Sequence, residues 1–187
     1  MASCNTDIDL MLRVKQGDEQ AFEELADRYR QPLTGFFYSL CWNLDSAQDY
    51  AQEVLLRVWL ARERYEPSAK LSTYIYRIAR NCWVMSLRRR KNRPEPMHYD
   101  EEWQPITDAG SLERWVIRRY IDRRIKLAVS GLPEHYRLVF VLSHFQEMKY
   151  KEISDILAIP VGTVKSRMSA AVRILREQIS KEMRDEL

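Results

Sequence analysis

Hydrophobic residues recur every three or four positions along most of the chain, which is the spacing of one face of an α-helix rather than the alternation of a half-buried strand. The clearest series run through Phe22, Leu25, Tyr29, Leu33, Phe36 and Leu40, through Val54, Leu55, Val58 and Trp59, and through Leu71, Ile75, Ile78 and Ala79. The same periodicity returns from Ile117 to Ala128 and from Leu138 to Leu142. The pattern predicts an all-α protein.

Several residues indicate where the first helices begin and end. Thr6 and Asp18 precede apolar series and are predicted N-caps, because their side-chain oxygens can accept hydrogen bonds from free backbone N–H groups. Gly17 is a predicted helix stop. Pro32 lies inside the second apolar series, where we expect a kink or a restart of the helix.

The composition changes sharply between Pro94 and Ser111. This segment holds three prolines, one glycine and no Lys or Arg, and its acidic residues are Glu95, Asp100, Glu101, Glu102 and Asp108. It is typical of a linker, so we expect two small helical domains, residues 1–93 and 112–187, joined by an acidic flexible linker at 94–111. An acidic segment of this kind can occupy a nucleic-acid path when no nucleic acid is bound.

The C-terminal domain contains the pattern of a helix-turn-helix. A short amphipathic helix is predicted from Tyr150 to Ile159, followed by a tight turn and a second helix that begins near Gly162. A second helix of this kind fits the DNA major groove, which is about 12 Å wide, and Lys165, Ser166 and Arg167 would face it. The alternative is an ordinary helical hairpin with a solvated basic face.

The segment from Pro67 to Pro94 has no acidic residue. Its basic residues are Lys70, Arg77, Arg80, Arg88, Arg89, Arg90, Lys91 and Arg93, and they alternate with aromatic rings and amides. Tyr74, Arg77 and Asn81 fall about one turn apart, and the loop from Tyr65 to Lys70 could close over them to form a pocket for an unstacked base. In the alternative interpretation, Tyr74 and Tyr76 are core residues and the arginine run is a solvated helix end.

The helix around Val54 carries a second candidate surface. Its apolar residues form one face, and Asp49, Gln52, Glu53 and Leu56 lie on another. This second face mixes acid, amide and leucine, which suits docking of a partner helix. Alternatively, the acidic residues are only solvated. Glu53 and Arg57, four residues apart, would then form an ion pair that stabilises the helix by about 0.3 kcal/mol.

The composition excludes some classes of protein but does not identify the function. The 187 residues are 45% hydrophobic and 30% charged with a net charge of +3, so local clustering says more about a partner than the total does. We expect a cytoplasmic protein without membrane insertion. The three cysteines are widely spaced (Cys4, Cys41, Cys82), no apolar run is long enough to cross a membrane, and the N-terminus does not resemble a leader. His98, His135 and His144 have no metal-ligand or nucleophile spacing, so we predict no catalytic residue, no metal and no cofactor.

Three motifs together resemble a known family. They are Asp49-x-x-Gln52-Glu53-Val54-x-x-x-Val58-Trp59, then Tyr76-Arg77-Ile78-Ala79-Arg80-Asn81 with Leu87-Arg88-Arg89-Arg90, and finally Leu132-Pro133-Glu134 through Gly162-Thr163-Val164-Lys165-Ser166-Arg167. In this order, with a linker between the second and the third, the chain resembles the extracytoplasmic-function group of bacterial sigma factors along nearly its whole length. The resemblance implies a subunit that binds core RNA polymerase, directs it to promoter DNA, helps to open the duplex and is controlled by an anti-sigma factor. It implies no enzymatic activity for the chain alone.

The resemblance also implies roles for single residues. Asp49, Gln52, Glu53 and Leu56 would face the polymerase. The melted -10 element would be held by Tyr65, Ser68, Lys70, Tyr74, Arg77, Arg80 and Asn81. The -35 element would meet Thr163, Lys165, Ser166, Arg167 and Arg173 in the major groove, and the linker would run through the polymerase cleft.

The chain departs from the usual pattern of this family at several positions. Members often have Phe and Trp where this chain has Leu71 and Tyr74, and Arg where it has Ala170 and Val172. Fewer cations on the second helix predict weaker -35 affinity unless Arg173 and Arg176 compensate. The turn position that usually holds Gly is Ala158, where a left-handed backbone would cost about 1 kcal/mol.

Two other classes of protein remain as alternatives. The first is a stand-alone helix-turn-helix regulator that binds duplex DNA as a dimer, and the second is a helical interaction protein that binds no nucleic acid. A dimeric regulator has no need of an acid-free aromatic segment beside a docking helix, and an interaction protein has no need of the basic run from Gly162 to Arg167.

Overall fold

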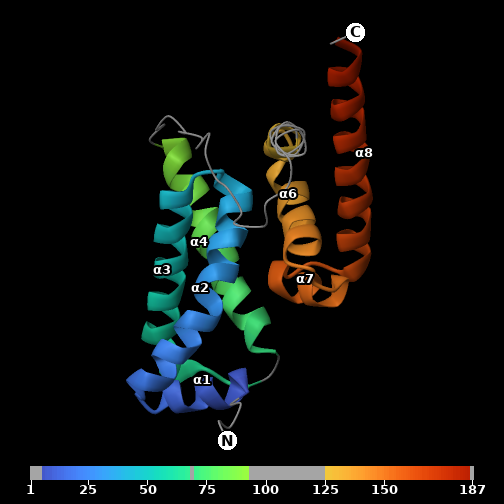
Figure 1. Ribbon diagram of the computed structural model, residues 1–187. Helices are drawn as coiled ribbons and strands as arrows, with labels where there is room; N and C mark the ends of the chain where they lie inside the picture. Colours follow the sequence, from blue (N-terminus) through green and yellow to red (C-terminus); the bar gives the residue numbers. More distant parts are fainter. Residues whose placement is uncertain (1–5, 68–69, 93–124, 186–187) are drawn as a thin grey trace, which may run out of the picture.

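The computed structural model describes residues 6–67, 70–92 and 125–185 (Figure 1), and all the secondary structure in these ranges is helical. The elements of the first domain are α1 (Asp7–Lys15), α2 (Glu19–Cys41), α3 (Leu44–Leu60), a 3₁₀ turn (Arg62–Arg64) and α4 (Leu71–Asn92). Those of the second domain are α6 (Glu134–Phe140), a π-helical turn η2 (Val141–Phe145), α7 (Tyr150–Leu157) and α8 (Val161–Asp185). The predicted all-α class with two helical domains is confirmed. The linker 94–111 and Cys4 lie outside the described residues.

Both predicted N-caps are confirmed. The Thr6 hydroxyl accepts a hydrogen bond from the Asp9 N–H at 3.2 Å, and the Asp9 carboxylate accepts one in return from the Thr6 N–H at 3.2 Å. Asp18 accepts from the Ala21 N–H at 3.0 Å and so begins α2. Gly17 separates the two helices with a φ of 89°, a conformation that favours glycine and explains why α1 stops there.

Of the two outcomes expected at Pro32, a kink or a restart, the restart is wrong, because α2 continues through Pro32 to Cys41. Proline removes one N–H donor from the helix, yet the next turns are fixed by burial of Leu33, Phe36 and Phe37, all fully excluded from solvent. The Thr34 hydroxyl also donates to the Arg30 carbonyl at 2.9 Å, in the turn that contains the proline. Tertiary packing outweighs the local signal here.

The second domain follows the predicted boundaries closely. Helical residues at 125–130 end at Gly131, and Pro133 precedes the first turn of α6. The short helix α7 buries Ile153, Ile156 and Leu157, as its amphipathic pattern predicts. α8 crosses it after a tight turn, so that the predicted helix-turn-helix is present.

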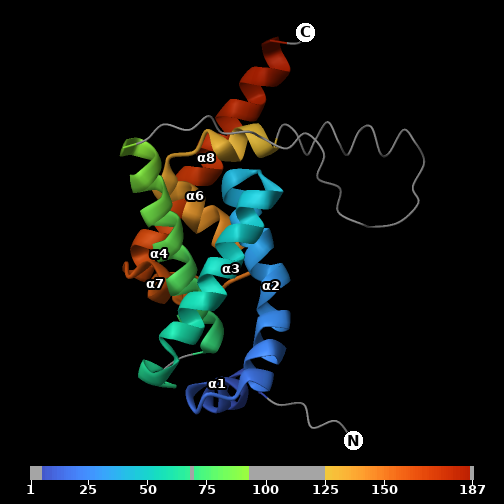
Figure 2. The same ribbon diagram turned by 90° about the vertical axis from the view of Figure 1, so that its left-hand side faces the viewer.

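The two domains lie side by side (Figures 1 and 2). α7 lies against α4, and η2 contacts α2. In Figure 2, α4 and α7 overlap at the left-hand side, while α1 and the last turns of α8 lie at opposite ends of the molecule. None of the described helices is both long and apolar enough to cross a membrane.

Candidate nucleic-acid interface

The first candidate surface follows one side of α4 and its start. We call Lys70, Tyr74, Arg77, Arg80 and Asn81 the basic stripe. Lys70, Arg77 and Asn81 are exposed, whereas Tyr74 and Arg80 are half-buried. The opposite side of the helix enters the core through Leu71, Ile75, Ala79 and Trp83, so the apolar spacing of the sequence fixes which side of α4 remains outside.

The cations of the basic stripe already have acceptors within the chain. Lys70 Nζ lies 2.7 Å from Glu152 Oε1, and Arg77 Nε donates to the backbone carbonyl of Asp155 at 2.9 Å. Arg80 donates to the carbonyl of Leu157 at 3.4 Å and to Asn81 Oδ1 at 2.9 Å. Apart from Asn81, these acceptors belong to α7, the first helix of the helix-turn-helix. The stripe therefore carries donors whose acceptors here are a carboxylate and backbone carbonyls.

Tyrosines close one end of the stripe. Tyr65 packs edge to face against Tyr74 with ring centroids 5.1 Å apart, and burial raises the pKa of both phenols. Tyr65 is 1% exposed, and its hydroxyl has no hydrogen-bond partner among the described residues. The buried Tyr65 ring thus packs against the Tyr74 ring and fixes its position. Ser68, between them in sequence, lies outside the described residues.

Tyr76 belongs to the core, as the alternative interpretation of this segment predicts. It is 3% exposed, it packs edge to face on Phe36, and burial raises its pKa. Its hydroxyl lies 2.5 Å from Gln146 Oε1 of the second domain. Tyr74, by contrast, keeps part of its ring accessible beside the stripe.

The arginine run at the end of α4 is divided between two environments. Arg88 and Arg89 are exposed. Arg90 instead donates to the Tyr50 hydroxyl at 2.9 Å, and its guanidinium carbon lies 5.7 Å from the centroid of the Trp83 ring. Arg90 therefore joins α4 to α3, while its two neighbours face solvent.

A second surface lies on α3, and we call Asp49, Gln52, Glu53 and Leu56 the docking face. Asp49, Gln52 and Leu56 are exposed, with Leu56 at 51%. Glu53 accepts from Arg57 Nε at 2.6 Å, and this bond raises the pKa of Arg57.

The sequence analysis missed two apolar side chains near this surface. Leu60 is 69% exposed and Met85 is 40% exposed. Arg57, which is paired with Glu53, connects Met85 to the docking face because its NH1 lies 3.8 Å from Met85 Sδ. Leu60 could have been found from its spacing, since it follows Leu56 by one helical turn. Met85 could not, because it comes from a different helix.

The helix-turn-helix depends on an unusual residue at its turn. Ala158 caps α7 with φ 53° and ψ 48°, the left-handed conformation in which a Cβ is strained. The turn is held by the Ser154 hydroxyl, which donates to the Ile159 carbonyl at 2.6 Å, and by the Ile159 N–H, which donates back to Ser154 O at 3.2 Å. Val164 then packs inward with no exposed surface and fixes the crossing of α7 and α8.

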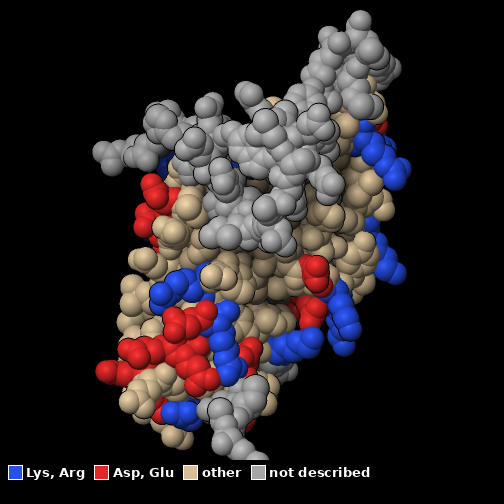
Figure 3. Space-filling view, viewed as in Figure 1, with Lys and Arg blue, Asp and Glu red and all other residues tan. Residues whose placement is uncertain are grey.

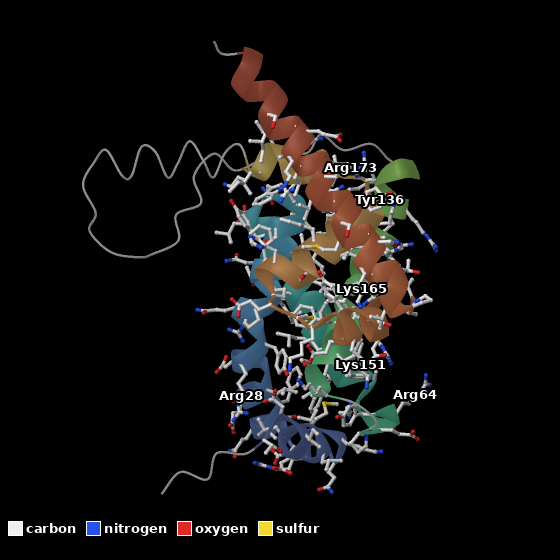
Figure 4. The ribbon with its side chains drawn as sticks, turned by 90° about the vertical axis from the view of Figure 1, so that its right-hand side faces the viewer. Arg28, Arg64, Tyr136, Lys151, Lys165 and Arg173 are labelled. Atoms are coloured by element: carbon white, nitrogen blue, oxygen red, sulfur yellow. The ribbon has the colours of Figure 1, made fainter. Side chains whose placement is uncertain are left out.

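The third surface is the first half of α8, and we call Thr163, Lys165, Ser166, Arg167 and Arg173 the recognition face. Lys165, Ser166 and Arg173 are exposed, and Thr163 and Arg167 are half-buried. Figure 4 shows Lys165 and Arg173 on α8, with Lys151 on the neighbouring α7. In Figure 3, Lys and Arg gather along the outer edge of α8, whereas Asp and Glu gather over α1 and the start of α2.

Comparison with known proteins identifies the two domains. Residues 25–93 match the family Sigma-70 region 2, and residues 122–175 match Sigma-70, region 4. The chain is also 33% identical over 178 residues to the ECF RNA polymerase sigma factor SigW of Bacillus subtilis, a match that covers 89% of this chain and 93% of that protein. The protein belongs to the extracytoplasmic-function group of sigma factors. It is a promoter-specificity subunit that binds core RNA polymerase and promoter DNA. The match to region 2 argues against a stand-alone helix-turn-helix regulator.

Solved structures agree on the fold of this sigma factor. CnrH, in complex with the cytosolic domain of CnrY, superposes with a TM-score of 0.72 at 19% identity and covers 95% of this chain and 99% of that chain. The sigma factor RpoE, in complex with the anti-sigma factor NepR from Bartonella quintana, gives a TM-score of 0.67 at 23% identity and covers 85% and 96%. The two-domain helical fold is therefore shared with known sigma factor structures.

Proposed function

We propose that the three surfaces divide promoter recognition among them. The docking face meets the polymerase, the basic stripe holds the melted -10 strand, and the recognition face meets the -35 duplex. The domains that carry these roles are residues 1–93 and 112–187, and the acidic linker 94–111 passes through the polymerase cleft. The protein acts in the cytoplasm by binding, without a catalytic step of its own.

The composition and exposure of the basic stripe carry this proposal. Lys70, Arg77 and Arg80 are cations on one side of a helix segment without acidic residues, with the accessible Tyr74 ring and the Asn81 amide beside them. Cations neutralise phosphate, an aromatic ring stacks on an unpaired base of any identity, and an amide can pair with a base edge. These are the groups that a single strand needs, whereas duplex recognition has no use for a stacking ring.

The recognition face suits a duplex instead. Lys165, Ser166 and Arg167 lie in the first turns of α8, and a helix N-terminus also presents free backbone N–H groups to phosphate. Arg173 extends the cationic line by two turns. Because Ala170 and Val172 supply no charge, this face offers fewer phosphate contacts than the sequence pattern of the group usually provides.

The test is reconstituted transcription with core polymerase on a promoter library. Sequence-specific start sites that require the chain are expected, and their absence would contradict the proposal. Permanganate reactivity of unpaired thymines then reports melting, and electrophoretic binding to a duplex that carries only the -35 bases reports the second domain. Variants of the basic stripe should affect the first measurement, and variants of the recognition face the second.

We also propose that an anti-sigma factor controls the protein, as the resemblance to this group implies. The exposed Leu56, Leu60 and Met85 give the docking face an apolar area that a regulator could cover in competition with polymerase. The measurement is affinity purification of the tagged chain from its own cells, followed by addition of the co-purified protein to the transcription reaction. A regulator must suppress initiation and lose that effect with Leu60→Arg, which leaves the four residues of the docking face unchanged. A co-purified protein that leaves initiation unchanged would contradict this role.

A further inference from the structure

The basic stripe is occupied by the chain's own second domain. Arg77 and Arg80 donate to the carbonyls of Asp155 and Leu157, which belong to the last turn of α7. These carbonyls have no helical N–H partner of their own, and the C-terminal end of a helix carries partial negative charge. Lys70 adds an ion pair with Glu152 on the same helix. The end of α7 thus presents anionic and carbonyl acceptors to the cations proposed to hold the DNA strand.

A second set of contacts holds the domains together beside the stripe. The Trp83 indole N–H donates to the Glu134 carboxylate, which also pairs with Arg137 at 2.9 Å. Arg137 reaches the Leu40 carbonyl at 3.4 Å, and Lys126 donates to the Tyr38 hydroxyl at 2.9 Å. With the Tyr76–Gln146 hydrogen bond, these contacts extend from the stripe to the end of α2. The domains are therefore joined by a continuous polar interface and not by a single touching point.

The recognition face, unlike the basic stripe, makes no such contact with the other domain among the described residues. Lys165, Ser166 and Arg173 remain exposed on α8 while the domains are in contact. Contact between the domains consequently gives three cations of the basic stripe acceptors on α7, whereas no recognition-face side chain forms a hydrogen bond or ion pair with the described residues of the first domain.

We propose that α7 is an internal competitor of the -10 strand, so that the free chain is closed to single-stranded DNA and opens when the two domains separate. The proposal rests on the role assigned above to the basic stripe. The closed chain keeps its affinity for duplex -35 DNA. Polymerase, which must hold the stripe and α8 at two different promoter elements, supplies the binding energy that separates α7 from α4.

The closed state is tested by zero-length cross-linking. A carbodiimide joins a lysine amine to a carboxylate only when the two are in contact, so the free chain should give a Lys70–Glu152 cross-linked peptide by mass spectrometry. Lys70→Arg keeps the ion pair but cannot be coupled, and it serves as the control. Core polymerase should reduce the yield of this peptide. Absence of the peptide in the free chain, or an unchanged yield in the polymerase complex, would overturn the inference.

Competition is tested with single-stranded DNA and variants that lie outside the basic stripe. Glu152→Gln combined with Gln146→Ala removes one ion pair and one hydrogen bond of the interface. The free variant should bind the non-template -10 strand of a promoter from the transcription assay about threefold to tenfold more tightly, because a larger fraction of the chain is open. Glu147→Gln, an exposed residue in the loop before α7, removes the same charge and should leave the affinity unchanged. Equal affinities for the double variant and the unchanged chain would contradict competition.

These measurements separate the two proposals. The cross-linking experiment needs no promoter and no transcription, so a cross-linked free chain that supports no specific initiation would reject the proposed function and leave the closed state standing. A chain that initiates at specific promoters but gives no cross-link would reject the closed state alone. Duplex -35 binding by the double variant should equal that of the unchanged chain, and a parallel gain there would indicate a general change in charge.

Discussion

The basic stripe of α4 and the recognition face of α8 are both cationic and lie in the same chain, yet their surroundings differ. The guanidinium groups of Arg77 and Arg80 donate to carbonyls of α7 in the other domain, while Lys165 is exposed and Arg173 donates to Glu177 of its own helix at 3.4 Å. The difference teaches that a basic sequence alone does not say whether its cations already have acceptors in another part of the molecule. A cation can be balanced internally by a helix end, which carries no formal charge and is invisible in a charge count.

The largest effect is expected when residues of the basic stripe are replaced and melting of the promoter DNA is measured. Tyr74→Ala should slow open-complex formation about tenfold, because stacking on one base contributes about 1–3 kcal/mol. Asn81→Ala should slow it by a similar factor, because hydrogen bonds from an amide to a base edge contribute about 1–3 kcal/mol. Binding of a duplex -35 probe should be unchanged. Permanganate reactivity and filter binding check the two steps. Arg89→Ala, an exposed cation further along the same helix, is the control and should cost less than either variant. An equal loss of melting and duplex binding would contradict a base-holding role.

The reverse outcome is expected for the recognition face. Lys165→Ala and Arg167→Ala should each weaken -35 duplex binding about fivefold and lower the slope of log affinity against log salt by about 0.9 where a phosphate contact is lost. Melting should be little affected once the complex has formed. A salt titration on a short duplex measures the slope. Variants that leave both slope and affinity unchanged would show that α8 does not contact the DNA at these residues.

The strained turn offers a smaller and purely structural effect. Ala158→Gly should raise the free energy of unfolding of the second domain by about 1 kcal/mol, since φ is 53° there and glycine adopts this conformation without strain. Urea unfolding measures it. Ala170→Gly is the matched control because Ala170 lies inside α8, where glycine should instead cost about 1 kcal/mol. Destabilisation by both variants would contradict the strain.

The smallest effect is a pH dependence of domain contact. The hydrogen bond from Lys70 lowers the pKa of Glu152 below its ordinary value of 4.5, and the Lys149 N–H within α7 lowers it further. The Lys70 contribution disappears when the domains separate, so Glu152 binds a proton more readily in the open chain. Contact is therefore fully favoured above the open-chain pKa and is weakened as the pH falls through the closed-chain pKa.

Small-angle scattering between pH 7 and pH 4 would detect this opening as a larger radius of gyration. The Glu152→Gln variant has no group to titrate at this position and is the control, in which the change should be smaller. An identical pH response in the two proteins would show that Glu152 does not link protonation to domain contact.

Much of the fold follows from local patterns. The N-caps at Thr6 and Asp18, the stop at Gly17 and the buried face of α7 are where the sequence predicts them, because capping and amphipathic burial act within a few residues. The helix restart, one of the two outcomes expected at Pro32, does not occur, for the opposite reason. Its local effect is outweighed by the burial of Phe36 and Phe37, which depends on helices distant in the sequence.

The candidate surfaces divide along the same line. Helical spacing correctly separated exposed Leu56 from buried Val58, and exposed Arg77 from buried Ile75. It could not show that Tyr65 is buried while Tyr74 is half-accessible, since both follow the same aromatic pattern. Nor could it find Met85 beside the docking face, because proximity between α3 and α4 depends on how the helices pack.

The sequence by itself determined the helical class, the order of the motifs, the cations of both DNA-facing surfaces and the strained position Ala158. These depend on residue type and on spacing within one helix. The tertiary structure alone decided which cations of the first domain meet acceptors in the second domain. Arg77 and Asp155 are 78 positions apart, and their 2.9 Å contact depends on two domains that approach each other, a relation that helical periodicity does not encode.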